Sequence, residues 1–185
     1  MDFKDVVKNI VEDVAVDLTQ EFDRNFERKA FFNKKWEETN YSNSRGSLLE
    51  RSGKLRRSIN KSNSGNSIRW RSSLPYAGIH NEGGEIEVTA KMKSYFWAMF
   101  YKANGAVSYS IKKKAANNTQ RNRKLSGEAA KWKAMALMKV GTIMTITQRQ
   151  FIGWHPQVDR RIQLVVNHNM EQVGKTIEKN LKPKR

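Results

Sequence analysis

The sequence contains no cysteine among its 185 residues. Disulfide frameworks, thiolate metal sites and cysteine nucleophiles are therefore excluded, and the fold must rely on packing or on assembly. The sequence also lacks an uninterrupted apolar run of about eighteen residues, so we expect neither a membrane-spanning helix nor a membrane partner. The first eight residues include Asp2 and Asp5 and lack the apolar run of a secretory signal. We expect a chain that is made and folded in the cytoplasm.

Bulky side chains are nevertheless plentiful. Eight Phe, five Trp and five Tyr supply groups that a disordered chain would lack, although hydrophobic residues make up only 38% of the chain. The length fits one domain, for which about 100 to 200 residues is usual. We therefore predict a single folded domain over residues 1–185, with a basic helical or loop segment at about 102–140.

Charge is unevenly distributed along the chain, whose formal net charge is +17. Residues 1–27 contain eight acids against three basic residues, whereas residues 51–73 contain seven basic residues and no acid. Residues 102–139 contain ten basic residues against one acid, and residues 175–185 five against one. A protein this far from neutrality repels itself unless an anionic partner or a complementary protein surface compensates the charge.

Apolar residues recur every three or four positions at both ends of the chain, which is typical of amphipathic helices. The first pattern covers residues 3–26 and predicts a helix that continues to about Trp36. A second pattern predicts a closing helix from Gln157 to about Leu181. Between them we expect a polar loop at residues 40–46 and a short helix through Leu48, Leu49 and Leu55.

The central part of the chain alternates strand and helix signals. Residues 60–66 form a Ser/Asn/Gly tract that predicts a turn, residues 67–72 alternate as a half-buried strand does, and residues 76–80 suggest a hairpin-like return. Gly83 and Gly84 predict a turn before a second strand at residues 85–89. Thr89 is expected to cap a helix through Phe100 that stops at residues 104–105.

The remaining elements lie in the basic segment and after it. Residues 112–124 have no apolar periodicity and predict a mobile loop. Ser126 is expected to cap a helix through Lys139, with Gly141 as its end, and residues 142–147 are expected to form a strand. Together these elements predict the α+β class.

No grouping of side chains indicates catalysis, and we expect no cofactor. His80, His155 and His168 lack the close spacing of metal ligands, so a metal site is not expected. Three acids, Glu82, Glu85 and Glu87, could hold a divalent ion for nuclease chemistry, but no second acidic strand is available to meet them, and a solvated strand face is the favoured interpretation. No serine occupies a nucleophile elbow.

Three segments, 49–58, 76–84 and 149–153, resemble the ordered signature of the phage virion morphogenesis family, the tail-completion and neck proteins of tailed phages. The resemblance extends from about Trp36 to Ile162, and residues 88–99 look like one subgroup of the family. The sequence departs from the pattern at Gln150, where a proline is common. The matching residues are Gly53, Leu55, Arg56, Ser58, Tyr76, Ala77, Ile79, His80, Gly83, Gly84, Arg149, Phe151 and Gly153.

The resemblance implies a small α+β subunit in which an antiparallel sheet is flanked by helices. It implies a homo-oligomeric ring at the head-to-tail junction of the virion, in contact with other neck, connector and tail proteins. It implies no catalysis. On physical grounds we expect the matching glycines to form turns, and Tyr76, Ile79, Phe151 and Trp154 to anchor the core or a subunit interface.

The basic runs support an alternative, a nucleic-acid-binding protein that contacts DNA without sequence preference. No recognition-helix, OB-fold or RRM signature is present, so we rank this alternative second. Trp70 lies between two arginines and could stack on a base. The residues expected to face phage DNA or an acidic protein partner are Lys112, Lys113, Lys114, Arg121, Arg123 and Lys124.

Overall fold

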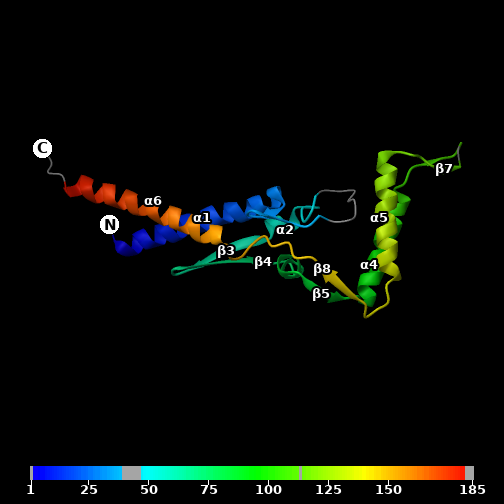
Figure 1. Cartoon of the computed structure of the whole chain (residues 1–185), viewed down its shortest axis with the longest axis horizontal. Coiled ribbons are helices and arrows are strands. Elements are labelled where there is room, and N and C mark those ends of the chain that lie inside the picture. The colour runs from blue at the N-terminus through cyan, green and yellow to red at the C-terminus, as the bar shows by residue number, and fades with distance from the viewer. Residues whose placement is uncertain (1, 39–46, 113, 182–185) are drawn as a thin grey trace. The chain divides into compact units, whose positions relative to one another are not determined.

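The structure is a computed structural model, and it describes residues 2–38, 47–112 and 114–181. It is 56% helical and 18% strand, which confirms the α+β class (Figure 1). The predicted loop at residues 40–46 and the side chain of Lys113 lie outside the described residues. In the described part of the chain, no helix is both long and apolar enough to cross a bilayer.

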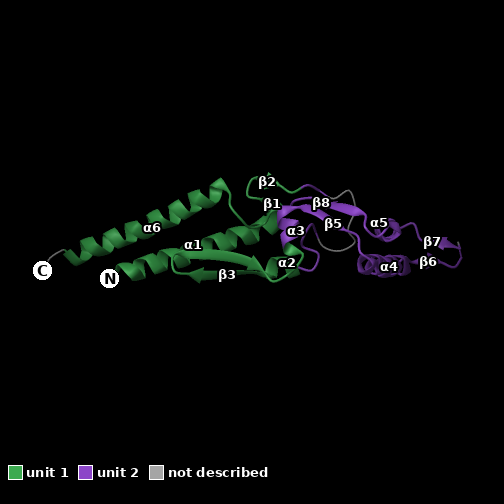
Figure 2. Ribbon diagram, turned by 90° about the horizontal axis from the view of Figure 1, so that it is seen from below, with its two compact units in different colours: residues 1–36, 54–77, 149–185 green, residues 37–53, 78–148 purple. Residues whose placement is uncertain are grey.

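The chain forms two compact units, and neither is a continuous stretch of sequence (Figure 2). Unit 1 comprises residues 1–36, 54–77 and 149–185, and unit 2 comprises residues 37–53 and 78–148. The prediction of one domain over the whole chain stays a prediction.

Helix α1 (Phe3–Arg28) begins at Asp2, whose carboxylate accepts the N–H of Lys4 at 3.2 Å. Its buried stripe confirms the predicted amphipathic helix, but the prediction that it continues to Trp36 is wrong. The helix ends because Lys29 adopts a left-handed conformation with φ of 53°. Strands β1 (Ala30–Phe31) and β2 (Lys34–Lys35) then reverse the chain, which lets Phe31 pack on Phe22 with 6.4 Å between ring centroids.

Helix α6 (Pro156–Leu181) confirms the predicted closing helix and lies antiparallel beside α1 (Figure 1). Pro156 suits the first helical turn because its missing N–H would have no partner there. The His155 ring nitrogen Nδ1 accepts the N–H of Gln157 at 3.1 Å and so satisfies one free donor of that turn. Farther along α6, Asn169 donates to the Asp13 carboxylate of α1 at 2.9 Å.

Strands β3 (Ile59–Ser64) and β4 (Ser67–Ser72) form an antiparallel hairpin in unit 1. The strand predicted at residues 67–72 is confirmed, but the turn predicted at residues 60–66 is wrong, because the turn is confined to Gly65 and Asn66. Polar residues occupy β3 because its side chains are largely exposed and the ladder holds its backbone. The hairpin-like return predicted at residues 76–80 is also wrong, since the chain there enters helix α3 (Ala77–Glu82).

In unit 2, strand β5 (Gly84–Glu87) pairs with β8 (Ile143–Ile146) in an antiparallel ladder, so both predicted strands are confirmed. Thr89 accepts the N–H of Met92 at 3.2 Å and caps α4 (Ala90–Gly105), as predicted. The short helix predicted from Leu48 is wrong in part. Leu49 is left-handed with φ of 58°, and only Lys54–Arg57, in unit 1, forms a helix, α2.

Helix α5 (Gln120–Leu137) packs along α4, and their shared core consists of Phe96, Ala103, Ala129, Trp132 and Ala136 (Figure 1). The cap is Thr119 and not Ser126, so the helix begins earlier than predicted. Strands β6 (Tyr109–Ser110) and β7 (Ala115–Ala116) form the connection between the helices. The loop predicted over residues 112–124 is therefore wrong from Gln120 onwards.

Candidate functional site

The first family-like segment fastens α2 to α1 within unit 1. The Leu55 side chain is buried, and the Ser58 hydroxyl donates to the Leu55 carbonyl at 2.7 Å. The guanidinium of Arg56 pairs with the carboxylate of Asp23 and with that of Glu27 at 2.7 Å. Charge-assisted contacts to two carboxylates orient this side chain, so α2 is attached to α1 and has a structural role. Gly53, which lies in the same segment immediately before α2, has φ of 65° and belongs to unit 2.

The third family-like segment lies against the same helix. Phe151 is 0% exposed, and its ring centroid lies 5.1 Å from that of Phe26. The Asn25 amide donates to the Phe151 carbonyl at 3.1 Å, while the Trp36 indole donates to the Gln150 carbonyl at 2.7 Å. These bonds hold the segment at the position where Gln150 replaces the proline of the family pattern.

Two further residues of this segment, Arg149 and Gly153, lie close to other side chains. Arg149 is buried. Gly153 has φ of 128°, and a Cβ there would lie 2.8 Å from the Gln150 amide nitrogen. Trp154, which we expected in the core or an interface, is 69% exposed and donates to the Asp159 carboxylate at 3.1 Å.

The second family-like segment is divided between the units. Tyr76 and Ala77 belong to unit 1, where Ala77 is buried and Tyr76 is 43% exposed. Ile79 and His80 are half-buried residues of α3 in unit 2. Gly83 and Gly84 follow with φ of 72° and 134°, a backbone conformation that other residues resist, and they join α3 to β5.

We expect Gly83→Ala to destabilise unit 2 by about 2 to 4 kcal/mol, because an L-residue is strained at this φ. A Cβ at Gly83 would also lie only 2.9 Å from the backbone nitrogen of Gln148. Urea unfolding followed by circular dichroism measures the change. Gly127→Ala on α5, where a Cβ meets nothing within 4 Å, is the matched control and should be neutral or slightly stabilising. Equal free energies of unfolding for the two variants would show that Gly83 does not need its left-handed conformation.

The acidic N-terminal segment is neutralised within unit 1. Arg161 of α6 forms a bidentate pair with Asp17 at 2.6 and 2.8 Å, and this hydrogen bonding raises the pKa of the guanidinium. Lys61 of β3 pairs with Glu12, and the hydrogen bond from the ammonium lowers the pKa of that carboxylate. Glu21 is buried among Arg24, Arg28 and Arg161. The sequence showed the acids but not these partners.

The predicted base-stacking residue is committed to packing. The Trp70 ring lies edge-on to Phe22 with 5.2 Å between centroids, and its indole donates to the Thr19 hydroxyl at 2.9 Å. Both partners lie on α1. Trp70 is therefore part of the contact between the β3–β4 hairpin and α1.

The predicted basic residues cluster at one end of the α4–α5 pair. Lys112 and Lys114 lie in the β6–β7 connection, and both are exposed. The prediction of a loop for Arg121, Arg123 and Lys124 is wrong, because Thr119 caps a helix that includes them. All three side chains are exposed on this helix.

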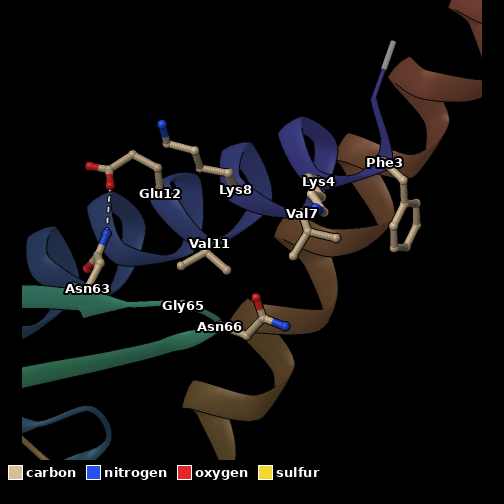
Figure 3. Close-up of a pocket in the computed structure, with 9 residues that line it drawn as sticks. All are labelled: Phe3, Lys4, Val7, Lys8, Val11, Glu12, Asn63, Gly65 and Asn66. Atoms are coloured by element: carbon tan, nitrogen blue, oxygen red, sulfur yellow. Dashed lines mark hydrogen bonds between the residues drawn. The ribbon is translucent and has the colours of Figure 1, made fainter.

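Two hollows lie along α1 in unit 1. The larger, of about 570 Å³, is bounded by the start of α1 and the β3–β4 turn, with the apolar Phe3, Val7 and Val11 beside polar Asn63 and Asn66 (Figure 3). The second, of about 360 Å³, is lined mainly by apolar side chains of α1, β4 and α6, including Leu18, Trp70 and Ile162. Both extend the apolar surface between the terminal helices and the hairpin.

The acids near α3 and β5 do not converge with others. Glu85 and Glu87 pair in register with Thr145 and Ile143 of β8, a strand without acidic residues. Within residues 2–38, 47–112 and 114–181, no three histidine or carboxylate groups gather as metal ligands would. Comparison of the chain with protein-family models, curated proteins and solved structures finds no match.

Proposed function

We propose that this protein is a structural subunit of a tailed-phage particle, a tail-completion or neck protein that assembles into a ring at the head-to-tail junction. The observation that carries the proposal is the apolar row of α6, which continues past the contact with α1. Met170 and Ile177 are each about half exposed, and Leu181 is 77% exposed. An amphipathic helix whose apolar stripe is incompletely covered is typical of a protein that assembles.

The family-like segments support the same proposal. Leu55 and Phe151 are buried, and Arg56 and the Gln150 carbonyl are tied to unit 1 side chains. Residues that serve packing in this way fit a subunit whose function is its shape and surface. The proposal includes no catalytic step, and its partners are further copies of the chain and other neck, connector and tail proteins.

We expect the purified protein to self-associate, and Ile177→Asp combined with Leu181→Asp to weaken that association about 100-fold. Burying two such side chains contributes about 3 kcal/mol, because both are already partly covered. Light scattering over a range of concentrations measures the change. Both residues are more than half exposed, so the free subunit should remain folded.

Gln172→Asp combined with Asn180→Asp is the matched control, since it adds the same charge at exposed polar positions of α6. The control should associate as the wild-type protein does. A wild-type protein that stays at 21.4 kDa at every concentration would contradict the proposal. If the variant with Ile177→Asp and Leu181→Asp associates as strongly as the control, the apolar row of α6 is not the interface.

A further inference from the structure

We propose that the basic arm of unit 2 binds the phosphate backbone of double-stranded DNA without reading its sequence. The arm is defined as residues 90–140, which comprise α4, the β6–β7 connection, α5 and the three residues after α5. This inference concerns a surface distinct from the α6 row. It does not depend on the proposed assembly.

The arm has almost no negative charge of its own. Residues 90–140 contain twelve lysines and arginines against one acid, Glu128. Glu128 is buried, pairs with Arg51 at 2.7 Å and accepts the Trp132 indole N–H at 3.4 Å. Because this carboxylate is used inside unit 2, it does not neutralise the arm's surface.

The arm's cations are directed to solvent. In the part of the arm that the structure describes, nine are exposed and form no ion pair. The pKa of the half-buried Lys131 is lowered by burial and by the neighbouring Arg51, which is consistent with a positive local potential. The exposed cations are Lys91, Lys102, Lys112, Lys114, Arg121, Arg123, Lys124, Lys133 and Lys139.

Unit 1 shows the contrasting arrangement. Seven of the eight acids in residues 1–27 have a hydrogen-bonded or ion-paired partner, five of them a lysine or arginine side chain. The described part of unit 2 has six acids outside the arm, Glu37, Glu38, Glu50, Glu82, Glu85 and Glu87. Strand β5, which contains Glu85 and Glu87, lies at the opposite end of the α4–α5 pair from β7 (Figure 1). The positive charge at the β6–β7 end of the arm therefore favours the binding of an anion from outside the chain.

The dimensions and distribution of the cations favour duplex DNA. Helix α5 contains 18 residues and is about 27 Å long, while duplex DNA presents one phosphate charge per about 1.7 Å of its axis. Exposed cations lie along α5, from Arg121 to Lys133, and in the β6–β7 connection, at Lys112 and Lys114. A duplex backbone offers phosphates densely enough to meet several of them at once.

Other anionic partners fit less well. Base stacking on single strands needs free aromatic faces. Tyr101 and Tyr109 are 65% and 63% exposed, but Tyr101 stacks on Trp97 with 6.0 Å between centroids, and the Tyr109 hydroxyl donates to the Lys114 carbonyl. An acidic protein would need several bulky anchors for an interface core, whereas the outward row of α5 presents Gly127, Ala130 and Ala134, with Leu137 as its large exposed side chain. The favoured contact is therefore phosphate alone.

The test is fluorescence anisotropy of the full-length protein with labelled 30-base-pair duplexes of unrelated sequence, over a range of salt concentrations. The arm variant replaces five exposed cations by glutamine, Lys112→Gln, Lys114→Gln, Arg121→Gln, Arg123→Gln and Lys124→Gln. We expect it to bind at least about 100-fold more weakly at 0.1 M salt. The slope of log K against log salt should be shallower by about 4, because each phosphate contact contributes about 0.9.

The matched control removes five exposed cations of unit 1, Lys34→Gln, Lys35→Gln, Arg69→Gln, Arg71→Gln and Arg160→Gln. It should bind DNA within about threefold of the wild-type protein, because the inference places none of these five cations against a phosphate. If the helix substitutions disturb folding, Lys112→Gln with Lys114→Gln alone should still reduce the slope by about 2. Equal DNA binding by the arm variants and the control would overturn the inference. Binding of one duplex sequence in preference to the others at high salt would also overturn the inference. So would an arm variant that loses binding to poly-glutamate, a mimic of an acidic protein, but keeps its binding to DNA.

Discussion

Phe151→Ala is expected to lower the free energy of unfolding by about 3 to 5 kcal/mol, as the truncation of large buried aromatics does. Phe151 has no exposed surface and packs on Phe26, whose ring in turn meets Trp36 with 5.7 Å between centroids. Removing the ring would leave a cavity where three segments of unit 1 meet. Urea unfolding followed by circular dichroism and tryptophan fluorescence measures the loss.

Phe3→Ala is the control for Phe151→Ala, because Phe3 is 76% exposed. Its unfolding free energy should change by less than about 0.5 kcal/mol, as at other exposed positions. Unchanged unfolding of Phe151→Ala would show that the residue is not in the core. Only a role in assembly would then remain for the third family-like segment.

Asn25→Ala should cost about 2 to 5 kcal/mol, although asparagine on a helix is usually dispensable. The Asn25 side chain is fully buried, donates to the Phe151 carbonyl and accepts the Phe32 N–H, both at 3.1 Å. Truncation would leave these two backbone groups without their partner, and each such buried group costs about 1 to 3 kcal/mol. Thermal and urea unfolding of the variant test the estimate.

Asn9→Ala provides the comparison for Asn25→Ala, since Asn9 is an exposed residue of the same helix. It should be neutral or slightly stabilising because alanine has the higher helix propensity. Similar stability of the two variants would show that the Asn25 hydrogen bonds are not needed to join α1 to the 149–153 segment.

The elements that the sequence predicted correctly are those with a local signal. The apolar periodicity of α1 and α6 follows from the helical repeat, and the alternation in β4 and β5 follows from the strand repeat. Thr89 was predicted as a cap because a hydroxyl before a helix accepts a free N–H, and it does so for Met92.

The errors arise where distant contacts decide the structure. No glycine or proline closely follows Arg28, so the sequence carries no local signal for the left-handed Lys29 that ends α1. The reversal is stabilised when Phe31 and Phe32 pack against Phe22 and when Asn25 accepts the Phe32 N–H. Strand β3 is polar and was predicted as a turn, but its ladder with β4 and the pair between Lys61 and Glu12 of α1 hold it extended.

The candidate sites were predictable only in part. The sequence drew attention to Arg56 and Phe151 but not to Asp23 and Asn25, the α1 residues that bind them. No spacing in the sequence identifies a partner 33 residues away, as for Asp23, or 126 residues away, as for Asn25. The basic segment was predicted from charge, and the first turns of α5 were predicted as a loop because residues 120–124 show no apolar periodicity; Thr119 caps the helix there.

Negative-stain electron microscopy of the purified protein tests the proposal that it is a ring-forming structural subunit. Images would be recorded for the protein alone and mixed with the other neck proteins of its particle. We predict closed rings of uniform size in at least the mixed preparation. Fields without closed particles in both preparations, from protein that is folded and concentrated, would contradict the account.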